Sequence, residues 1–223
     1  MKDYKLAIED GVITWVENTD ENGNPISRRL FIPKEVTAFD VDAWVFLGCE
    51  ADAIVVDSEN DVFSSAHNCL LSKDGKKLIK VCKNSDVSKL TSLEIIGQDA
   101  FNDLNVERDE FVFRIPDGVK ILDYRAFAVN ARNVKNVVPS SVRAIGALAF
   151  MIHSDSTHIV FEGDAELEVG AFGTELEARD SDIAVYNSMP SILYPKKENL
   201  TVTCPKESNV SSYCNKYEIT EVK

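Results

Sequence analysis

A thirteen-residue pattern recurs along the chain and limits the possible folds more than any other feature of the sequence. A full copy has an aliphatic residue and proline at its start, valine at the fifth position, an aliphatic residue at the eighth and Ala-Phe at its end. The terminal aromatic residues are Trp44, Phe101, Phe127, Phe150 and Phe172, so the last three intervals are 26, 23 and 22 residues. A unit this short cannot bury its own apolar face, so we expect the units to stack and share a continuous core.

Within a unit, the sequence predicts a strand, a proline that ends it and a short helical turn. Phe111, Phe113 and Ile115 alternate with other residues, which is typical of a strand with one buried face. Proline ends the strand because it has no amide hydrogen for a ladder hydrogen bond. The Ala-Phe pair then falls on the helical turn, where we expect the ring to fill the core between coils. An aromatic platform for a ligand is the alternative interpretation of these rings.

The interval from Trp44 to Phe101 is 57 residues and contains an insertion. Two strand-like runs flank Asp74-Gly75, and an Asp-Gly pair predicts a tight hairpin turn with both residues at positive φ. The register of the first unit stays open, because Phe46, three residues before Cys49, could anchor it in place of Trp44.

These motifs resemble the BspA-like leucine-rich repeat family, whose units read roughly I-P-x-x-V-x-x-I-x-x-x-A-F-x-x-C-x-x-L. The resemblance implies one solenoid domain of the leucine-rich-repeat type over residues 1–223, β-rich with short helical turns. It implies an N-terminal cap hairpin in 1–31 and repeats in 32–172, with a hairpin insertion near 68–81. An irregular last repeat and a C-terminal cap would occupy 173–223.

The C-terminal cap also has a physical basis in the sequence. Ser208 is a candidate N-cap for a short helix with one apolar face, because four apolar residues follow it at helical spacing. Such a helix would cover the last coil, which a solenoid needs for solubility. The four apolar residues are Val210, Tyr213, Cys214 and Tyr217.

Composition excludes several classes of function. The chain has 24 Lys and Arg against 37 Asp and Glu, a net charge of −13, which gives no basic face for nucleic acid. No apolar run approaches the roughly 18 residues of a membrane helix. The motifs G-x-S-x-G, G-x-x-x-x-G-K-[ST] and G-x-G-x-x-G are absent from the sequence. We therefore expect no catalysis, no cofactor, no nucleic-acid partner and no membrane insertion.

The sequence also gives no metal site. His67, His153 and His158 are not spaced as metal ligands, and the five cysteines form no C-x-x-C pair. We expect the cysteines to be small buried hydrophobic residues. Asp57 to Asp61 alternates oxygen ligands, but Val62 and Asn68 stand where a calcium loop needs glycine and glutamate, which favours a turn. A second acidic cluster, interpreted as a solvated edge, consists of Asp164, Glu166 and Glu168.

The resemblance implies a non-catalytic, monomeric interaction module, typical of bacterial surface or secreted adhesins that bind a protein or a glycan. A cytoplasmic scaffold is the alternative, favoured by the cysteines and by Met1 to Asp10, which lack the apolar stretch of a secretory signal. The compartment stays open: surface or secreted if the native chain starts upstream with a signal, otherwise cytoplasmic. A less favoured alternative is a glycan-acting enzyme that uses paired carboxylates such as Asp164 and Glu166.

A solenoid binds through the extended surface made by equivalent strand positions. The strand alternation places six side chains on the outer face, and we expect these to form the binding surface. They are Val112, Arg114, His158, Val160, Thr201 and Thr203.

Overall fold

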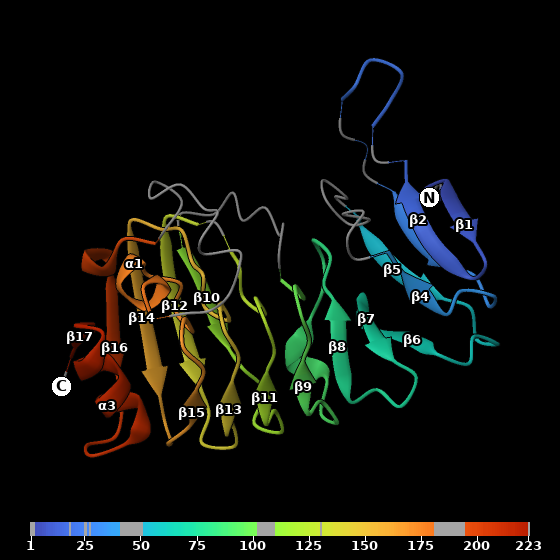
Figure 1. Ribbon diagram of the computed structural model, residues 1–223. Coiled ribbons are helices and arrows are strands. Elements are labelled where there is room, and N and C mark those ends of the chain that lie inside the picture. Colours follow the sequence, from blue (N-terminus) through green and yellow to red (C-terminus); the bar gives the residue numbers. More distant parts are fainter. Residues whose placement is uncertain are drawn as a thin grey trace. The chain divides into compact units, whose positions relative to one another are not determined.

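The computed structural model describes residues 3–17, 19–24, 26, 28–40, 51–101, 110–129, 131–180 and 195–222. Trp44, Phe46 and Cys49, on which the register of the first repeat depends, lie outside the described residues. The chain divides into two compact units, Met1–Ser92 and Leu93–Lys223, which Figure 1 shows with their elements labelled. The single domain over 1–223 stays a prediction, and each unit is described by itself.

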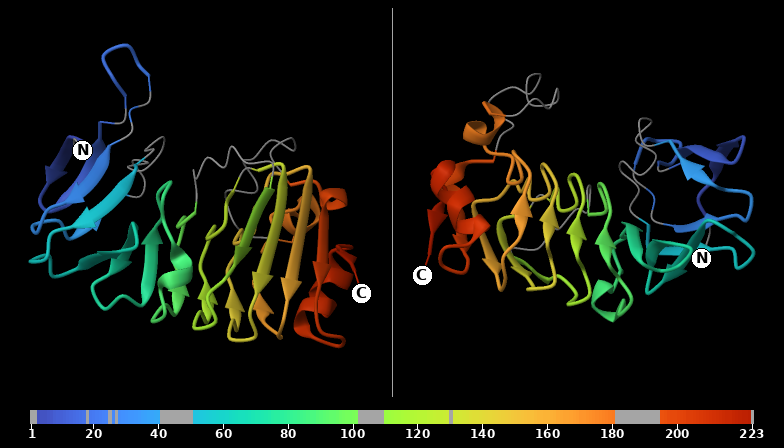
Figure 2. Two further views of the ribbon diagram at one scale, coloured as in Figure 1. Left: turned by 180° about the vertical axis from the view of Figure 1, so that it is seen from behind. Right: turned by 60° about the horizontal axis from the view of Figure 1, so that its bottom comes forward.

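The unit Leu93–Lys223 is a β-solenoid built from two parallel sheets (Figures 1 and 2). Successive strands of each sheet come from successive coils of the chain. One sheet has the short strands β9 (Ile95–Ile96), β11 (Ile121–Leu122), β13 (Ala144–Ile145) and β15 (Glu166–Leu167). The other sheet consists of β10 (Glu110–Arg114), β12 (Asn133–Val138), β14 (Ser156–Phe161), β16 (Leu200–Thr203) and β17 (Thr220–Glu221).

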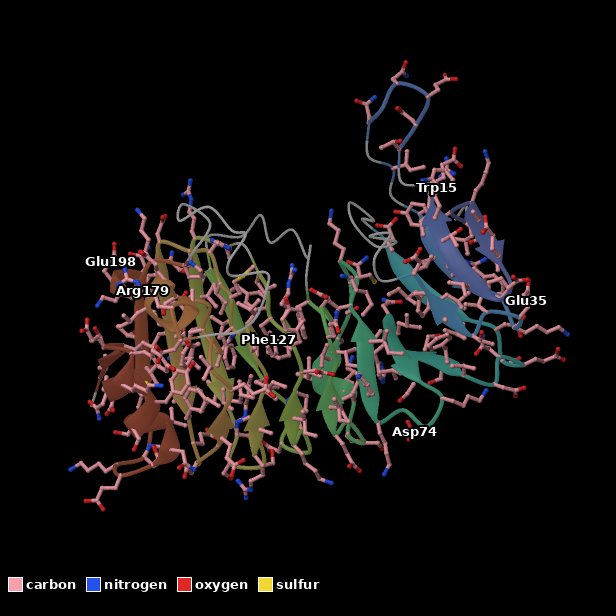
Figure 3. All side chains as sticks on the ribbon, viewed as in Figure 1. Trp15, Glu35, Asp74, Phe127, Arg179 and Glu198 are labelled. Atoms are coloured by element: carbon pink, nitrogen blue, oxygen red, sulfur yellow. The ribbon has the colours of Figure 1, made fainter. Side chains whose placement is uncertain are left out.

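The phenylalanines of the repeat form the core of this unit. Phe101, Phe127, Phe150 and Phe172 are buried, and neighbouring rings stack with centroid distances of 4.5, 5.8 and 5.9 Å along the series. Figure 3 labels Phe127 in the interior of the unit. A fully buried ring has no face to offer to a ligand. The prediction of core rings is confirmed, and the alternative of a ligand platform is wrong for these four.

Each coil turns on a left-handed residue two positions before its phenylalanine. Asp99, Arg125, Leu148 and Gly170 have φ values of 53°, 52°, 57° and 89°. The amide of Arg125 donates to the carbonyl of Ala147 in the next coil, and the amide of Leu148 donates to the carbonyl of Gly170. Only the last of the four residues is glycine, the residue type that adopts this conformation without steric cost. The hydrogen bonds between coils therefore impose the turn on the other three.

Among the described residues, two short helices and one strand end the solenoid at its C-terminal side. They are α1 (Glu175–Ala178), α3 (Asn209–Lys216) and β17, with a short 3-10 turn at Lys197–Asn199. Helix α3 begins after Ser208, whose hydroxyl accepts a hydrogen bond of 3.0 Å from the amide of Ser211. Val210 and Cys214 on the apolar face of this helix are buried. The predicted capping helix is thus confirmed with its N-cap.

The side chains of Tyr213 and Glu177 take the place of a next coil. In the preceding coil, the amides of Leu148 and Phe150 donate to backbone carbonyls of the following coil. In the last coil, the equivalent amide of Gly170 donates to the hydroxyl of Tyr213 (2.9 Å), and that of Phe172 donates to Oε1 of Glu177 (3.1 Å). The two side chains therefore supply acceptors to amides of the last coil, as the backbone of a following coil would. We call these two side chains the terminal cap.

The unit Met1–Ser92 begins with the predicted N-terminal hairpin. Its turn residues, Asp10 and Gly11, both have positive φ (49° and 80°), as a two-residue hairpin turn requires. The hairpin strands are β1 (Leu6–Glu9) and β2 (Val12–Val16). Parallel pairs then follow, β2 with β4 (Ala38–Phe39) and β3 (Arg29–Ile32) with β5 (Ala53–Val56).

The predicted insertion is an antiparallel arrangement of β6 (Phe63–Ala66), β7 (Cys69–Ser72) and β8 (Lys77–Lys80). The hairpin of β7 and β8 lies where the sequence placed it. Strand β6 and its turn to β7 were not predicted. In that turn His67 and Asn68 have positive φ (50° and 60°), and the carbonyl of His67 accepts a hydrogen bond from the amide of Asp86 (3.0 Å).

The turn between β7 and β8 differs from the prediction. Only Gly75 has positive φ (73°), whereas Asp74 does not. One carboxylate oxygen of Asp74 accepts hydrogen bonds from the hydroxyl of Ser72 (2.6 Å) and from the amide of Lys76 (3.1 Å). The carboxylate therefore organises a longer loop, and the expectation of two positive φ values at Asp74-Gly75 is wrong.

Candidate interaction surface

The strand register brings the six predicted residues together in two rows across four neighbouring strands (Figure 1). The structure adds one residue of β12 to each row. We call these eight residues the strand face. The first row is Val112, Lys135, His158 and Thr201, and the second is Arg114, Val137, Val160 and Thr203.

The alternation that placed these side chains outward is confirmed. Val112 has an exposed fraction of 60%, Arg114 and Lys135 are exposed, and the other five residues are half-buried. The row between them points inward, and three of its four members are Asn136, Ile159 and Val202, all fully buried. The face is therefore a continuous outer surface of one sheet.

Lys135 and Val137 were missed because one inward residue of β12 is polar. In a strand with one buried face, Asn136 belongs at an outward position by residue type, yet it is fully buried. The spacing of the repeat could have found them. Lys135 follows Val112 by 23 residues and precedes His158 by 23, the same interval that separates Phe127 from Phe150.

Arg114 is held by two carboxylates. Its guanidinium donates to both oxygens of Glu162 (2.6 and 2.9 Å) and to Oδ1 of Asp117 (2.9 Å). These hydrogen bonds raise the pKa of Arg114 and lower that of Glu162. Arg114 therefore brings no free positive charge to the strand face, and it ties the end of β10 to the end of β14 across β12.

His158 is tied to the neighbouring strand. Its Nε2 lies 3.0 Å from the hydroxyl oxygen of Thr203, and that hydroxyl lies 3.1 Å from the carbonyl oxygen of Val222. Thr201 donates to the carbonyl of Thr157 at 3.2 Å. The polar side chains of β14 and β16 are thus fixed by contacts within the unit.

Lys135 differs from its neighbours on the face. It makes no hydrogen bond or ion pair with any other residue that the structure describes. Its side chain is exposed on β12, and the residue lies between Val112 of β10 and His158 of β14. It is therefore the charge on the strand face that is available to a partner.

The structure confirms that Asp57 to Asp61 is a turn. Asn60 is fully buried, and its Oδ1 accepts hydrogen bonds from the amides of Val62 (2.9 Å) and Phe63 (2.7 Å). The ammonium group of Lys73 contacts the carbonyl of Asn60. The side-chain oxygen of Asn60 thus serves the backbone of the turn. Across the described ranges, no group of three or more His, Cys, Asp or Glu side chains is placed to hold a metal ion.

The three acidic residues in the last coils are exposed, as the interpretation of a solvated edge predicted, and two of them also make hydrogen bonds within the unit. Asp164 accepts hydrogen bonds from the amide (2.8 Å) and side chain (3.0 Å) of Asn209 at the start of α3. Glu168 accepts one from the amide of Ala147 (3.0 Å). Glu166 is exposed on β15.

The described cysteines are free, as the sequence predicted. Cys69, Cys82 and Cys214 are buried, and Cys204 is half-buried. Burial raises the pKa of Cys69 to about 11 and that of Cys214 to about 12, which keeps both in the unreactive thiol form. These residues act as small core side chains.

Comparisons with known proteins add little. No family model and no curated protein matches the chain. A solved structure similar to it is the crystal structure of the pneumococcal vaccine antigen PcpA, with a TM-score of 0.48 and 13% sequence identity. The match covers 89% of this chain and 56% of that one, so the chain spans just over half of the antigen's length. Within the described ranges, no helix has the length and apolar character needed to cross a membrane.

Proposed function

We propose that the chain is a non-catalytic interaction module that binds a protein partner through the strand face. The observation that supports this proposal is the fixed arrangement of the face. Bonds within the unit hold Arg114, His158 and Thr203 in place, while Val112 and Lys135 are left exposed. A surface that is ordered before binding loses less conformational entropy when a partner docks.

A protein fits this face better than a glycan does. The face mixes valines with a few polar groups, the composition of a protein interface core inside a polar rim. The face has no Phe, Tyr or Trp side chain, and its one ring, the imidazole of His158, is held by Thr203. For the alternative of a glycan-acting enzyme, Asp164 is exposed but already accepts hydrogen bonds from Asn209 at the start of helix α3.

The family resemblance extends the proposal to a biological setting. The β-solenoid is compatible with a BspA-like leucine-rich repeat, and such proteins are typical of adhesion at bacterial surfaces. We therefore propose a surface or secreted adhesin-like protein, with a cytoplasmic scaffold as the alternative. Protease treatment of intact source cells, followed by peptide mass spectrometry, separates the two. Peptides released before lysis support the adhesin, and peptides found only after lysis support the scaffold.

Site-specific photo-crosslinking tests the binding face. A photoreactive amino acid replaces Val112 in one version of the full chain and Ile121 in the other, and both are expressed in the source cells. Both positions are exposed aliphatic residues on strands of the same unit, with exposed fractions of 60% and 40%, but they belong to different sheets. The proposal predicts a protein adduct at position 112 that is absent at 121. Equal crosslinking at both positions, or none at 112, would overturn it.

A further inference from the structure

Lys135 and His158 are direct neighbours across two parallel strands, β12 and β14, and both side chains lie on the outer face. Directly opposed side chains on one face of a sheet are close enough to touch the same small group. What the pair offers to a partner depends on which hydrogen-bonding groups the two side chains have left.

The contacts of Thr203 fix the imidazole tautomer of His158. A threonine hydroxyl has one proton, and a backbone carbonyl can only accept, so Thr203 donates its proton to the carbonyl of Val222. The same oxygen must then accept from Nε2 of His158, which therefore carries a hydrogen. In the neutral ring, the other nitrogen, Nδ1, is left as an acceptor.

Lys135 supplies hydrogen-bond donors next to this acceptor. Its ammonium group has three donors and no acceptor, and no described residue uses them. The pair thus presents a donor beside an acceptor. Arg114, the other cation on the face, is already bound by Glu162 and Asp117 and does not compete.

We propose that Lys135 and His158 together recognise a carboxamide group of the protein partner, from an Asn or Gln side chain or from exposed backbone. The carbonyl oxygen of the amide accepts from Lys135, and its N–H donates to Nδ1 of His158. A carboxylate would satisfy Lys135 but would set a second acceptor against Nδ1, which is repulsive. The neighbouring valines, Val112 and Val160, help to keep water away from the two bonds. This inference rests on the proposed function of the strand face.

Nuclear magnetic resonance of the full 15N-labelled chain at pH 8 provides the test. Long-range correlations identify the protonated ring nitrogen of His158, which we expect to be Nε2. Acetamide and acetate then serve as probes, with the 15N shifts of His158 and Lys135 as the readout. We expect acetamide to bind about fivefold more tightly than acetate, the change that one hydrogen bond brings.

Three variants sharpen the test. Lys135→Met should abolish the acetamide shift at His158, whereas Lys206→Met, an exposed lysine of the same unit, should leave it unchanged. Thr203→Val removes the acceptor of the Nε2 hydrogen, so the preference for acetamide over acetate should fall. The backbone spectrum of this variant should stay like that of the wild type, which shows that the fold is kept. Protonation of Nδ1 in the wild-type chain, equal or tighter binding of acetate, or an acetamide shift that survives Lys135→Met would overturn the proposal.

The outcomes also separate this inference from the function on which it rests. A protein adduct at position 112, together with no preference for acetamide, overturns only the carboxamide pair. A preference for acetamide without any adduct at 112 overturns the proposed function and leaves the chemistry of the pair in place.

Discussion

The hydroxyl oxygen of Tyr213 lies 2.5 Å from Oε1 of Glu177, and this contact joins helix α3 to helix α1 at the end of the solenoid. The hydroxyl also accepts hydrogen bonds from the amides of Gly170 (2.9 Å) and Ala171 (3.1 Å). Two side chains, distant from each other in the sequence, thus close the last coil. We therefore expect the stability of the unit to be sensitive to substitution of either side chain.

Replacement of Tyr213 by phenylalanine should destabilise the unit by about 1–3 kcal/mol, because the amides of Gly170 and Ala171 and the buried carboxylate of Glu177 each lose a hydrogen bond. Urea-induced unfolding measures the change. Tyr217→Phe is the matched control, since its hydroxyl contacts Asp180 and Lys216 at the surface, and we expect a much smaller effect. Equal losses in the two variants would contradict the role of Tyr213 in the terminal cap.

The carboxyl group of Glu177 should make stability depend on pH. Burial raises its pKa, although hydrogen bonds from Tyr213, Thr174 and Phe172 act in the opposite direction. Because the folded pKa lies above the unfolded value, this group stabilises the fold most below its unfolded pKa, and the contribution is lost as pH rises through the folded pKa. The free energy of unfolding of the wild type minus that of Glu177→Gln should therefore fall between pH 4 and pH 8. A difference that rises with pH would show a lowered pKa instead.

Asn136 should be a source of instability. It is fully buried on β12, and neither atom of its side-chain amide has a hydrogen-bond partner among the described residues. Asn136→Val should stabilise the chain by roughly 1–2 kcal/mol, since an unpaired amide leaves the core. Asn60, also fully buried but hydrogen-bonded through both atoms, is the control. Asn60→Val should destabilise, and a loss of stability in both variants would show that Asn136 is satisfied in solution.

Cysteine labelling should follow burial. In the native protein, a thiol reagent should modify half-buried Cys204 before Cys69 and Cys214, whose pKa values burial raises to about 11 and about 12. Peptide mass spectrometry scores each position separately, including Cys49. In urea the described cysteines should react at similar rates. Fast native labelling of Cys69 would show that the strand pair β7–β8 opens locally.

The regular parts of this fold could be predicted from the sequence because their signals are local. The interval between phenylalanines gave the coils, and the alternation in Phe111, Phe113 and Ile115 gave the outer face of β10. The turn at Asp74 was predicted wrongly because the hydroxyl of Ser72 and the carboxylate compete with the favoured backbone geometry.

Contacts between distant residues could not be predicted in the same way. Asp164 bonds to Asn209 and Tyr213 bonds to Glu177, and no repeat or periodicity connects the members of either pair. Lys135 was missed for a different reason, since an inward asparagine breaks the alternation of β12. The proposed pair of Lys135 and His158 depends on a tautomer that only the contacts of Thr203 reveal.

The terminal cap has a consequence for the length of the solenoid. Tyr213 and Glu177 offer acceptors to the last coil in the way that a further coil would, so the cap can close whichever coil precedes it. One additional unit of 23 residues, copied from Ala128 to Phe150, could therefore be inserted in register without redesign of the C-terminal end. Each such duplication would add one strand to the outer sheet. The number of duplicated units would thus set the width of the binding surface, and the C-terminal end of the fold would stay the same.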